Sequence, residues 1–439
     1  MTKPQLSVMI DTYTAPTRTI SNPSFLSRSF GPLTPGGIRQ SMFTLISAAI
    51  GGGILCLPYV MSQAGIVNGS ILLLIATILA FVSMRMLLLS ASLTGADSYG
   101  QLLSMASDSE YAATFLDIVT ILFGQGVVIA YFVFLGDFVP PVAAVMGGIP
   151  ILADRTACIL ICCIFAIPFA IPNKLSALQY ITPISTLSLA ITACVVVVRT
   201  DHTRSNSAEY IALDYAIFDW NLLKCFAIVI SSFICHTNVV AVAGELVEPS
   251  ERRSTKVALR AALVQLVLYL IISVCGYASF GRNIAQNFIK NYPEDDSLIT
   301  ICRILLSLTI FFGLPINTNP TAKALVNLFS PQKHCTFTEP LLPPVTPRTT
   351  ADNHLRIGLG MGVLLTGSVI SLYVPGIADV ISILGGSLGT LIMLVFPAMI
   401  YKSIFKSELT RTDHLLVNIL LISAAACFSS VVLTIFRVI

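Results

Sequence analysis

Three consecutive glycines, Gly51, Gly52 and Gly53, lie in the middle of the apolar stretch Ser41–Met61. The stretch is long enough to cross a bilayer, but each glycine costs a helix interior roughly 1 kcal/mol relative to alanine. A helix that breaks inside a membrane exposes backbone N–H groups, and the positive end of its dipole attracts an anionic group. The triplet therefore predicts an anion-binding site at a broken helix. The alternative is a small-residue face that packs against a neighbouring helix.

Composition places the chain in a membrane. Hydrophobic residues make up 55% of the 439 residues, charged residues make up 11%, and the mean hydropathy is +0.85. A soluble domain carries about 25% charged residues, so we predict an all-α polytopic membrane protein. The net charge of +3 is small and forms no basic stripe, so nucleic acid is not an expected partner. The five histidines show no metal-ligand spacing, and neither a metal nor an organic cofactor is expected.

The apolar segments predict about eleven transmembrane helices. We place them at residues 42–62, 66–93, 111–140, 155–172, 178–199, 222–245, 257–280, 298–326, 356–374, 377–401 and 415–436. Residues 1–40 are rich in Ser, Thr and Pro and lack the apolar core of a signal peptide. We therefore expect a disordered tail over 1–40 and a single transmembrane domain over 41–439.

Lys and Arg residues in the loops predict the orientation. With the N-terminus inside, the loops on that side carry sixteen of them: Lys3, Arg18, Arg28, Arg39, Lys174, Arg252, Arg253, Lys256, Arg260, Lys323, Lys333, Arg348, Arg356, Lys402, Lys406 and Arg411. The other side carries six: Arg155, Arg199, Arg204, Arg282, Lys290 and Arg437. The N-terminus is therefore expected in the cytoplasm. An odd number of helices puts the C-terminus on the opposite face.

Six motifs in order resemble those of the amino acid/auxin permease family, which includes vesicular and vacuolar amino acid transporters. The resemblance covers nearly all of residues 38–436. The motifs are Gly51–Gly65 (GGGILCLPYVMSQAG), Ser98–Leu102 (SYGQL), Gly124–Pro140 with Tyr131 and Asp137, Phe233–Arg253 with His236 and Glu245, Leu314–Pro320 (LPINTNP), and Gly385–Pro397.

The resemblance implies a fold. It is the five-plus-five inverted repeat of bacterial leucine-type transporters, shared by the amino acid–polyamine–cation superfamily. The repeats would be about 42–199 and about 222–401, and about 415–436 would be an extra C-terminal helix. Spans one, two, six and seven would rock against a scaffold to give alternating access. The first and sixth spans would both be broken near the midplane, although Cys235–Asn238 in the sixth contains neither Gly nor Pro.

The resemblance also implies a substrate site at the two breaks. N–H groups of the glycine triplet would bind an α-carboxylate, and carbonyls near Ser232 and Phe233 would bind an α-ammonium. Tyr131 would line the site from the third span, or it is an ordinary packed tyrosine. The substrate-binding candidates are Ser47, Ile50, Gly51, Gly52, Gly53, Tyr131, Ser232, Phe233 and His236.

The coupling ion is predicted from a departure from the family pattern. Sodium-driven relatives supply a side-chain oxygen from the first span and a hydroxyl from the eighth. Ser47 precedes the triplet, but Gly313 stands where that hydroxyl is expected, and Thr309 lies one turn earlier. Between H⁺ and Na⁺, we therefore expect proton coupling or facilitated exchange. His236 is either a proton-responsive gate or a neutral histidine bonded between helices.

The leading function is secondary active transport of amino acids by a monomer in the plasma membrane or in a vacuolar or lysosomal membrane. No acidic residue is expected at the midplane, since Asp117 and Asp137 lie near span ends, so a neutral substrate is favoured over a cationic one. The alternative is an amino-acid sensor of the same fold that signals through its N-terminal tail. An intramembrane enzyme is disfavoured because paired acids and His-x-x-x-x-Asp or Asp-His-His-Cys arrangements do not occur.

Overall fold

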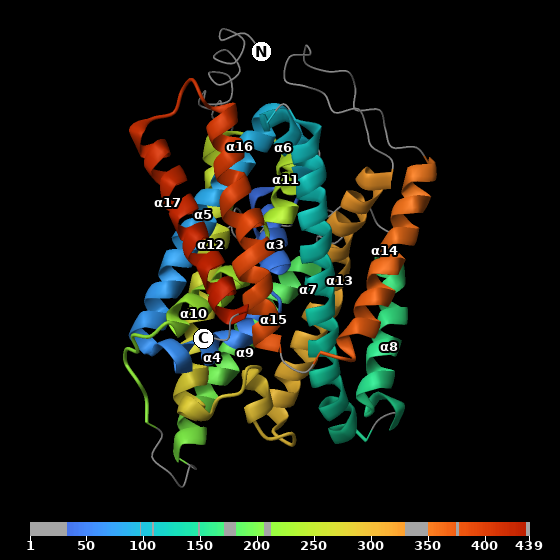
Figure 1. Cartoon of the computed structure of the whole chain (residues 1–439). Helices are drawn as coiled ribbons and strands as arrows, with labels where there is room; N and C mark the ends of the chain where they lie inside the picture. The colour runs from blue at the N-terminus through green and yellow to red at the C-terminus, as the bar shows by residue number, and fades with distance from the viewer. Residues whose placement is uncertain are drawn as a thin grey trace.

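The computed structural model describes residues 33–96, 98–107, 109–147, 150–170, 181–205, 212–329, 350–374 and 377–435. Over these ranges the protein is a bundle of helices without strands (Figure 1). The helices are α3 (Ile38–Ala49), α4 (Gly52–Ala64), α5 (Ile66–Thr94), α6 (Tyr99–Ser107), α7 (Glu110–Val145), α8 (Arg155–Ala166), α9 (Ile181–Ser205), α10 (Asn221–Ser232), α11 (His236–Glu245), α12 (Glu251–Phe280), α13 (Ser297–Phe329), α14 (Thr350–Ser371), α15 (Ile377–Leu384), α16 (Phe396–Ile404) and α17 (Arg411–Ile435). Short 3₁₀ helices occupy Pro150–Leu152, Ile167–Ala170, Gly281–Asn283 and Phe288–Asn291, and π-helical turns join α15 to α16 at Gly385–Gly389 and Leu391–Val395.

The predicted class, an all-α polytopic membrane protein, is confirmed. Among the described residues, nine helical segments are long and apolar enough to cross a membrane, and the bent pair α3 and α4 makes ten. The remaining predicted span is the shorter apolar helix Arg155–Phe169. A total of eleven spans stays a prediction.

Several boundaries differ from the predicted ones. The first helix begins at Ile38, so the region before it is shorter than predicted, and residues 1–32 lie outside the described ranges. Helix α7 continues past Pro140 to Val145. An additional helix, α6, precedes α7 at the predicted Ser98–Leu102 motif. The segment 327–355, which lies between two predicted spans, is helical at both ends, and its residues 330–349 are not described.

The long helix α7 lies in the centre and packs along α13, while α4 packs against α10 and α12 (Figure 1). Helix α12 also contacts α5 and α9, and α14 covers α7 and α13. The proposed repeat would relate α3 and α4 to α10 and α11, and α7 to α13. That internal symmetry stays a prediction.

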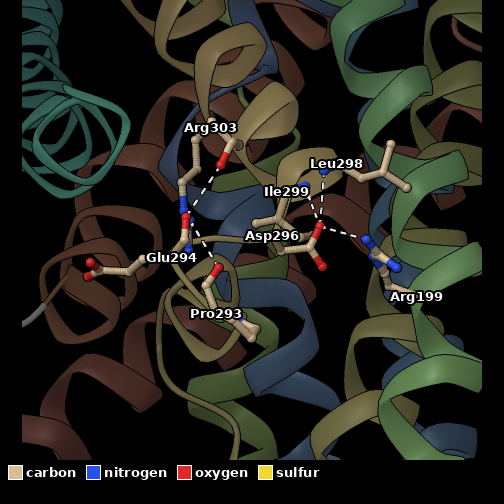
Figure 2. Close-up of polar contacts among 8 residues, drawn as sticks. Arg199, Pro293, Glu294, Asp296, Leu298, Ile299 and Arg303 are labelled. Atoms are coloured by element: carbon tan, nitrogen blue, oxygen red, sulfur yellow. Dashed lines mark hydrogen bonds and ion pairs between the residues drawn. The ribbon is translucent and has the colours of Figure 1, made fainter. Parts of the chain in front are cut away.

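The segment between α12 and α13 is tied firmly to the bundle (Figure 2). The buried guanidinium of Arg303 donates to the carbonyls of Tyr292 at 3.0 Å, Pro293 at 3.2 Å and Glu294 at 3.3 Å. Phe288 and Ile289, in the same segment, are fully buried. The segment is therefore part of the packed structure.

Asp296 fixes the start of α13 (Figure 2). Its carboxylate accepts from Arg199 at 2.8 Å and from the backbone amides of Leu298 and Ile299 at 3.0 and 3.2 Å. Burial alone would raise the pKa of Asp296, but these donors outweigh burial and hold the pKa below its usual value. An N-terminal carboxylate of this kind also complements the helix dipole.

Candidate functional site

The first predicted break is present between α3 and α4, whose axes differ by 62°. Gly51 separates them with an extended backbone (φ −154°, ψ −159°), and it offers no side-chain cap to α4. The first N–H groups of a helix have no partner inside it. The amides at the start of α4 are therefore available to an anionic group. The carbonyl of Ile50, at the end of α3, accepts the hydroxyl of Tyr131 at 3.1 Å.

The second predicted break is also present, between Ser232 at the end of α10 and His236 at the start of α11. It forms without glycine or proline. The backbone amides of Phe233 and Ile234 each donate a hydrogen bond to the carbonyl three residues earlier, and these bonds close the last turn of α10. The carbonyl of Ser232 accepts the hydroxyl of Tyr269 at 2.9 Å. A buried carbonyl needs such a partner. One tyrosine hydroxyl therefore caps the C-terminal end of each interrupted helix.

A central cavity of about 40 Å³ lies between the two breaks. Its lining residues are Ala48, Ala49, Gly51, Gly52, Gly53, Phe123, Val127, Ala130, Tyr131, Ser231, Ile234, Asn317, Ile381 and Leu384. The structure thus brings together the triplet and Tyr131, as predicted. Ser231 and Ile234 line the cavity where Ser232 and Phe233 were expected, and Ser47, Ile50 and His236 do not line it.

Close packing also explains the glycine triplet. A Cβ atom at Gly51 would lie 2.8 Å from the ring of Tyr131. At Gly52 it would collide with the ring of Phe134, and at Gly53 with the hydroxyl of Ser232. The two interpretations of the triplet are therefore compatible: the missing side chains let neighbouring helices approach, and the exposed amides remain beside the cavity.

Gly313 has a packing role that its sequence position did not reveal. A Cβ at Gly313 would lie 2.9 Å from the Tyr131 ring, on the edge opposite to the one that faces Gly51. The ring of Tyr131 is thus held between two glycines, one on the broken first span and one on α13. A hydroxyl-bearing side chain at 313 would require this ring to move.

Asn317, one turn after Gly313, is a lining residue that the sequence did not predict. Its amide nitrogen donates to the hydroxyl of Tyr131 and to the carbonyl of Gly313, both at 3.1 Å. The available signal was an asparagine inside an apolar span, between the Pro315 and Pro320 of the quoted motif. Polar residues at membrane depth are costly and often functional.

His236 lies away from the cavity. Its Nε2 atom is 2.8 Å from the hydroxyl of Ser83 on α5, and the imidazole is fully buried. Its Nδ1 atom has no hydrogen-bond partner within the described part of the chain. This placement is the one expected of a histidine bonded between helices.

Two hydroxyls named for ion coupling, those of Ser47 and Thr309, are buried on α3 and α13. Neither has a hydrogen-bond partner among the described residues. Unpaired buried hydroxyls are costly, so water or a cation would satisfy them. Gly313 contributes only its carbonyl, which already accepts from Asn317.

Two further cavities flank the central one along α7. The N-side cavity lies near the start of α7 and has a volume of about 50 Å³. It is lined by Ser98, Tyr99, Gly100, Asp117, Thr120, Thr237, Asn238, Val240, Ala241, Asn319, Pro320, Lys323, Ala324 and Asn327. The far-side cavity lies near the end of α7 and has a volume of about 510 Å³. It is lined by Val133, Asp137, Arg155, Ala285, Gln286, Asn287, Lys290, Leu372, Tyr373 and Val374. Helix α7 therefore contributes, in order, to all three cavities.

Comparison with known proteins identifies the family. Residues 34–436 match the profile of the family described as transmembrane amino acid transporter protein. The chain belongs to this family. The family is one of transporters and not of enzymes, in agreement with the sequence-based expectation.

Curated relatives are named as amino acid transporters. Putative amino acid transporter AAT1 of Toxoplasma gondii is 32% identical over 312 residues, which are 70% of this chain and 43% of the relative. Vacuolar amino acid transporter 5 of Saccharomyces cerevisiae is 23% identical over 87% of this chain and 91% of the relative. Sodium-coupled neutral amino acid transporter 7 of Bos taurus is 22% identical over 87% of this chain and 84% of the relative. The match spans less than half the length of the Toxoplasma protein.

Proposed function

We propose that the protein is a secondary transporter of neutral amino acids that works by alternating access. The observation that carries the proposal is the central cavity, which joins two broken helices and, among the described residues, has no ionisable lining residue except Tyr131. A zwitterion carries no net charge, so it needs oriented dipoles at its two ends and no compensating charged side chain. A cationic or anionic side chain would find no counter-charge in this lining.

The start of α4 suits the α-carboxylate. The free amides that follow Gly51 and the positive end of the α4 dipole both favour an anion. The predicted ammonium ligands change, because neither Ser232 nor Phe233 lines the cavity and the carbonyl of Ser232 accepts from Tyr269. A different acceptor for the ammonium is argued below.

Most other lining side chains are apolar, with Phe123, Val127, Ile234, Ile381 and Leu384 among them, and the polar ones are those of Tyr131, Ser231 and Asn317. Such a wall favours an apolar substrate side chain over a polar one. The cavity of about 40 Å³ holds only a few waters, since one water needs about 10–15 Å³ on this measure. Binding of a whole amino acid therefore requires the helices around the cavity to separate, as alternating access demands.

The names of the relatives agree with this choice. Neutral substrates are named for the Bos taurus relative and for putative sodium-coupled neutral amino acid transporter 11 of Rattus norvegicus, and a vacuolar location for the yeast relatives. For this chain we propose a neutral substrate, a vacuolar, lysosomal or plasma membrane, and a cytoplasmic N-terminus. The charge asymmetry of the loops supports that orientation.

We propose that transport does not require sodium. Gly313 lacks the expected hydroxyl, and the Tyr131 ring fills the space that a side chain there would need. Ser47 and Thr309 still offer two hydroxyls without a partner among the described residues, which makes a sodium requirement the competing outcome. Proton coupling or facilitated exchange remains the proposal.

Ligand-induced stabilisation tests the proposed substrate class. The full-length protein in detergent is heated with each of the twenty amino acids in turn, and the midpoint of unfolding is measured. Because a ligand that binds only the folded state raises that midpoint, we expect apolar neutral amino acids to raise it and lysine, arginine, aspartate and glutamate to leave it unchanged. Stabilisation by charged amino acids alone would contradict the proposal.

A further inference from the structure

Asn317 presents an unused acceptor to the central cavity. An asparagine amide has two donor hydrogens, and both are used here, by the hydroxyl of Tyr131 and by the carbonyl of Gly313. Because the Gly313 carbonyl can only accept, the amide nitrogen must face it, and this fixes the position of Oδ1. That oxygen accepts no hydrogen bond within the described part of the chain, and the residue is 7% exposed.

Other polar groups around the cavity are less suited to a cation. The Tyr131 hydroxyl donates to Ile50 and accepts from Asn317. The carbonyl of Ser232 is taken by Tyr269. The amide oxygen of Asn317 is therefore an acceptor beside the cavity without a donor among the described residues, and it lies on a different helix from the amides of α4.

We propose that Oδ1 of Asn317 binds the α-ammonium of the substrate, while the amides of α4 bind its α-carboxylate. This inference rests on the proposed function. The zwitterion would then bridge the broken first span and α13, with the carbonyl of Gly313 fixing the orientation of the asparagine amide.

Competition by substrate analogues tests this assignment. Uptake of a labelled neutral amino acid that the wild type transports is inhibited by the unlabelled amino acid, by its des-amino acid and by its methyl ester. In the wild type the des-amino acid should inhibit much more weakly than the amino acid. The quantity compared is the inhibition constant of the des-amino acid divided by that of the amino acid. In Asn317→Ala this ratio should shrink about ten- to a hundredfold, because a hydrogen bond to a charged group is lost. The inhibition constant of the methyl ester divided by that of the amino acid should stay unchanged, because the α-carboxylate site is intact.

Tyr131→Phe is the matched control, since it removes the hydroxyl that Asn317 contacts but leaves Oδ1 in place. It should weaken all competitors alike and keep the ratio within about threefold of the wild type. A ratio that is unchanged in Asn317→Ala would overturn the assignment. Should Asn317→Ala not fold, Asn317→Asp takes its place: a carboxylate must enlarge the ratio, and an unchanged ratio overturns the assignment. If the wild type transports no amino acid, the proposed function itself has failed.

A separate observation concerns the two ends of α7. Asp117 is buried at the N-side cavity, where the amide of Asn327 donates to its carboxylate oxygens at 3.2 and 3.4 Å, and Lys323 lines the same cavity. At the far-side cavity, Asp137 binds Lys290 at 2.8 Å and accepts from Asn287 at 3.2 Å. The side chain of Asp137 is 9% exposed.

The two clusters contain the same three residue types and lie about 20 residues apart, or roughly 30 Å of helix, close to the thickness of a bilayer core. Each joins α7 to a segment from the second half of the chain. The far-side partners, Asn287 and Lys290, belong to the segment that Arg303 anchors (Figure 2), so this segment can leave α7 only by breaking the contacts to Asp137. We propose that the three cavities lie along one transport route and that the two clusters are the gates at its two ends.

Reciprocal accessibility tests the gates. Val133→Cys reports on the far-side cavity and Ala241→Cys on the N-side cavity, each labelled by a membrane-impermeant maleimide applied to its own face. Labelling is measured relative to the parent protein with its native cysteines. Lys290→Ala should increase labelling at 133 and decrease it at 241, each about two- to fivefold, as for loss of a partly exposed ion pair.

Lys406→Ala, which removes an exposed lysine outside the three cavities, is the control and should change neither site. Opposite changes at the two sites indicate a shift between two conformations. Labelling that rises at both sites, or that does not change at 133, would show a merely structural ion pair and overturn the gate.

Discussion

The hydroxyl of Tyr131 donates to the carbonyl of Ile50 across 3.1 Å and so joins the central helix α7 to the broken end of α3. The same hydroxyl accepts from Asn317 on α13. Three helices therefore meet at one phenol oxygen beside the cavity. Any movement of the first span against α7 and α13 must change this contact.

Tyr131→Phe should weaken transport without unfolding the protein. It leaves the buried carbonyl of Ile50 without its donor, at a cost of about 1–3 kcal/mol. We expect a loss of roughly ten- to a hundredfold in the ratio of maximal uptake rate to KM, measured in proteoliposomes. Tyr215→Phe, on a side chain that is 73% exposed, is the control and should behave as the wild type. Equal uptake by the two variants would remove Tyr131 from the site.

Gly52→Ala should abolish uptake, because its Cβ would collide with the buried ring of Phe134. Gly358→Ala is the matched control: it also adds one methyl group in a helix, but nothing lies within 4 Å of its Cβ. Both proteins should express and insert. Normal uptake by Gly52→Ala would show that the close approach of α4 and α7 is not needed.

Tags at Met1 and Ile439 should be accessible from opposite faces of the membrane, with the first in the cytoplasm. The reason is the charge asymmetry of sixteen Lys and Arg residues against six, together with the predicted odd number of spans. Protease protection in sealed vesicles measures it. Two tags protected on the same face would mean that the apolar helix Arg155–Phe169 does not cross, or that one span was miscounted in 356–401.

Replacing sodium with choline at constant pH should leave uptake unchanged, and an inwardly directed proton gradient should increase it. The physical reason is the incomplete sodium shell: Ser47 and Thr309 supply two hydroxyls, and Gly313 supplies none. Uptake that disappears in choline would refute this and would assign those two hydroxyls to a sodium ion.

His236→Gln tests a narrower form of the same idea. Because His236 is fully buried, bonds Ser83 and does not line the central cavity, the change should leave both the pH dependence of uptake and KM close to those of the wild type. Uptake between pH 5 and 8 measures both effects, the range in which an ordinary histidine titrates. A flattened pH profile would contradict this and make His236 a proton-responsive group, whereas an unaltered profile makes Asp137 the next residue to test.

The sequence predicted the first break because glycine is a strong local signal. The second break was inferred from the family resemblance alone, since Phe233, Ile234 and Cys235 have no local tendency to end a helix. There the decisive contact comes from Tyr269, more than thirty residues away, whose hydroxyl takes the free carbonyl of Ser232. Tertiary partners of this kind are not visible in one sequence.

The same limitation explains the shifted site residues. Ser231 and Ser232 are neighbours, and only the direction in which α10 ends decides that Ser231 faces the cavity. Gly313 was considered only for the hydroxyl it lacks, whereas the structure shows that it makes room for Tyr131. Asn317 could have been chosen as a rare polar residue in an apolar span, but its role depends on which neighbours consume its donors.

Flux through the protein is the most direct test of amino acid transport. Purified wild-type protein is reconstituted into liposomes, and uptake of each labelled amino acid is measured beside Gly52→Ala and Gly358→Ala. We predict saturable uptake of apolar neutral amino acids by the wild type and by Gly358→Ala, and background uptake by Gly52→Ala. Amino acid binding without flux in a correctly inserted wild-type protein would contradict transport and favour a sensor.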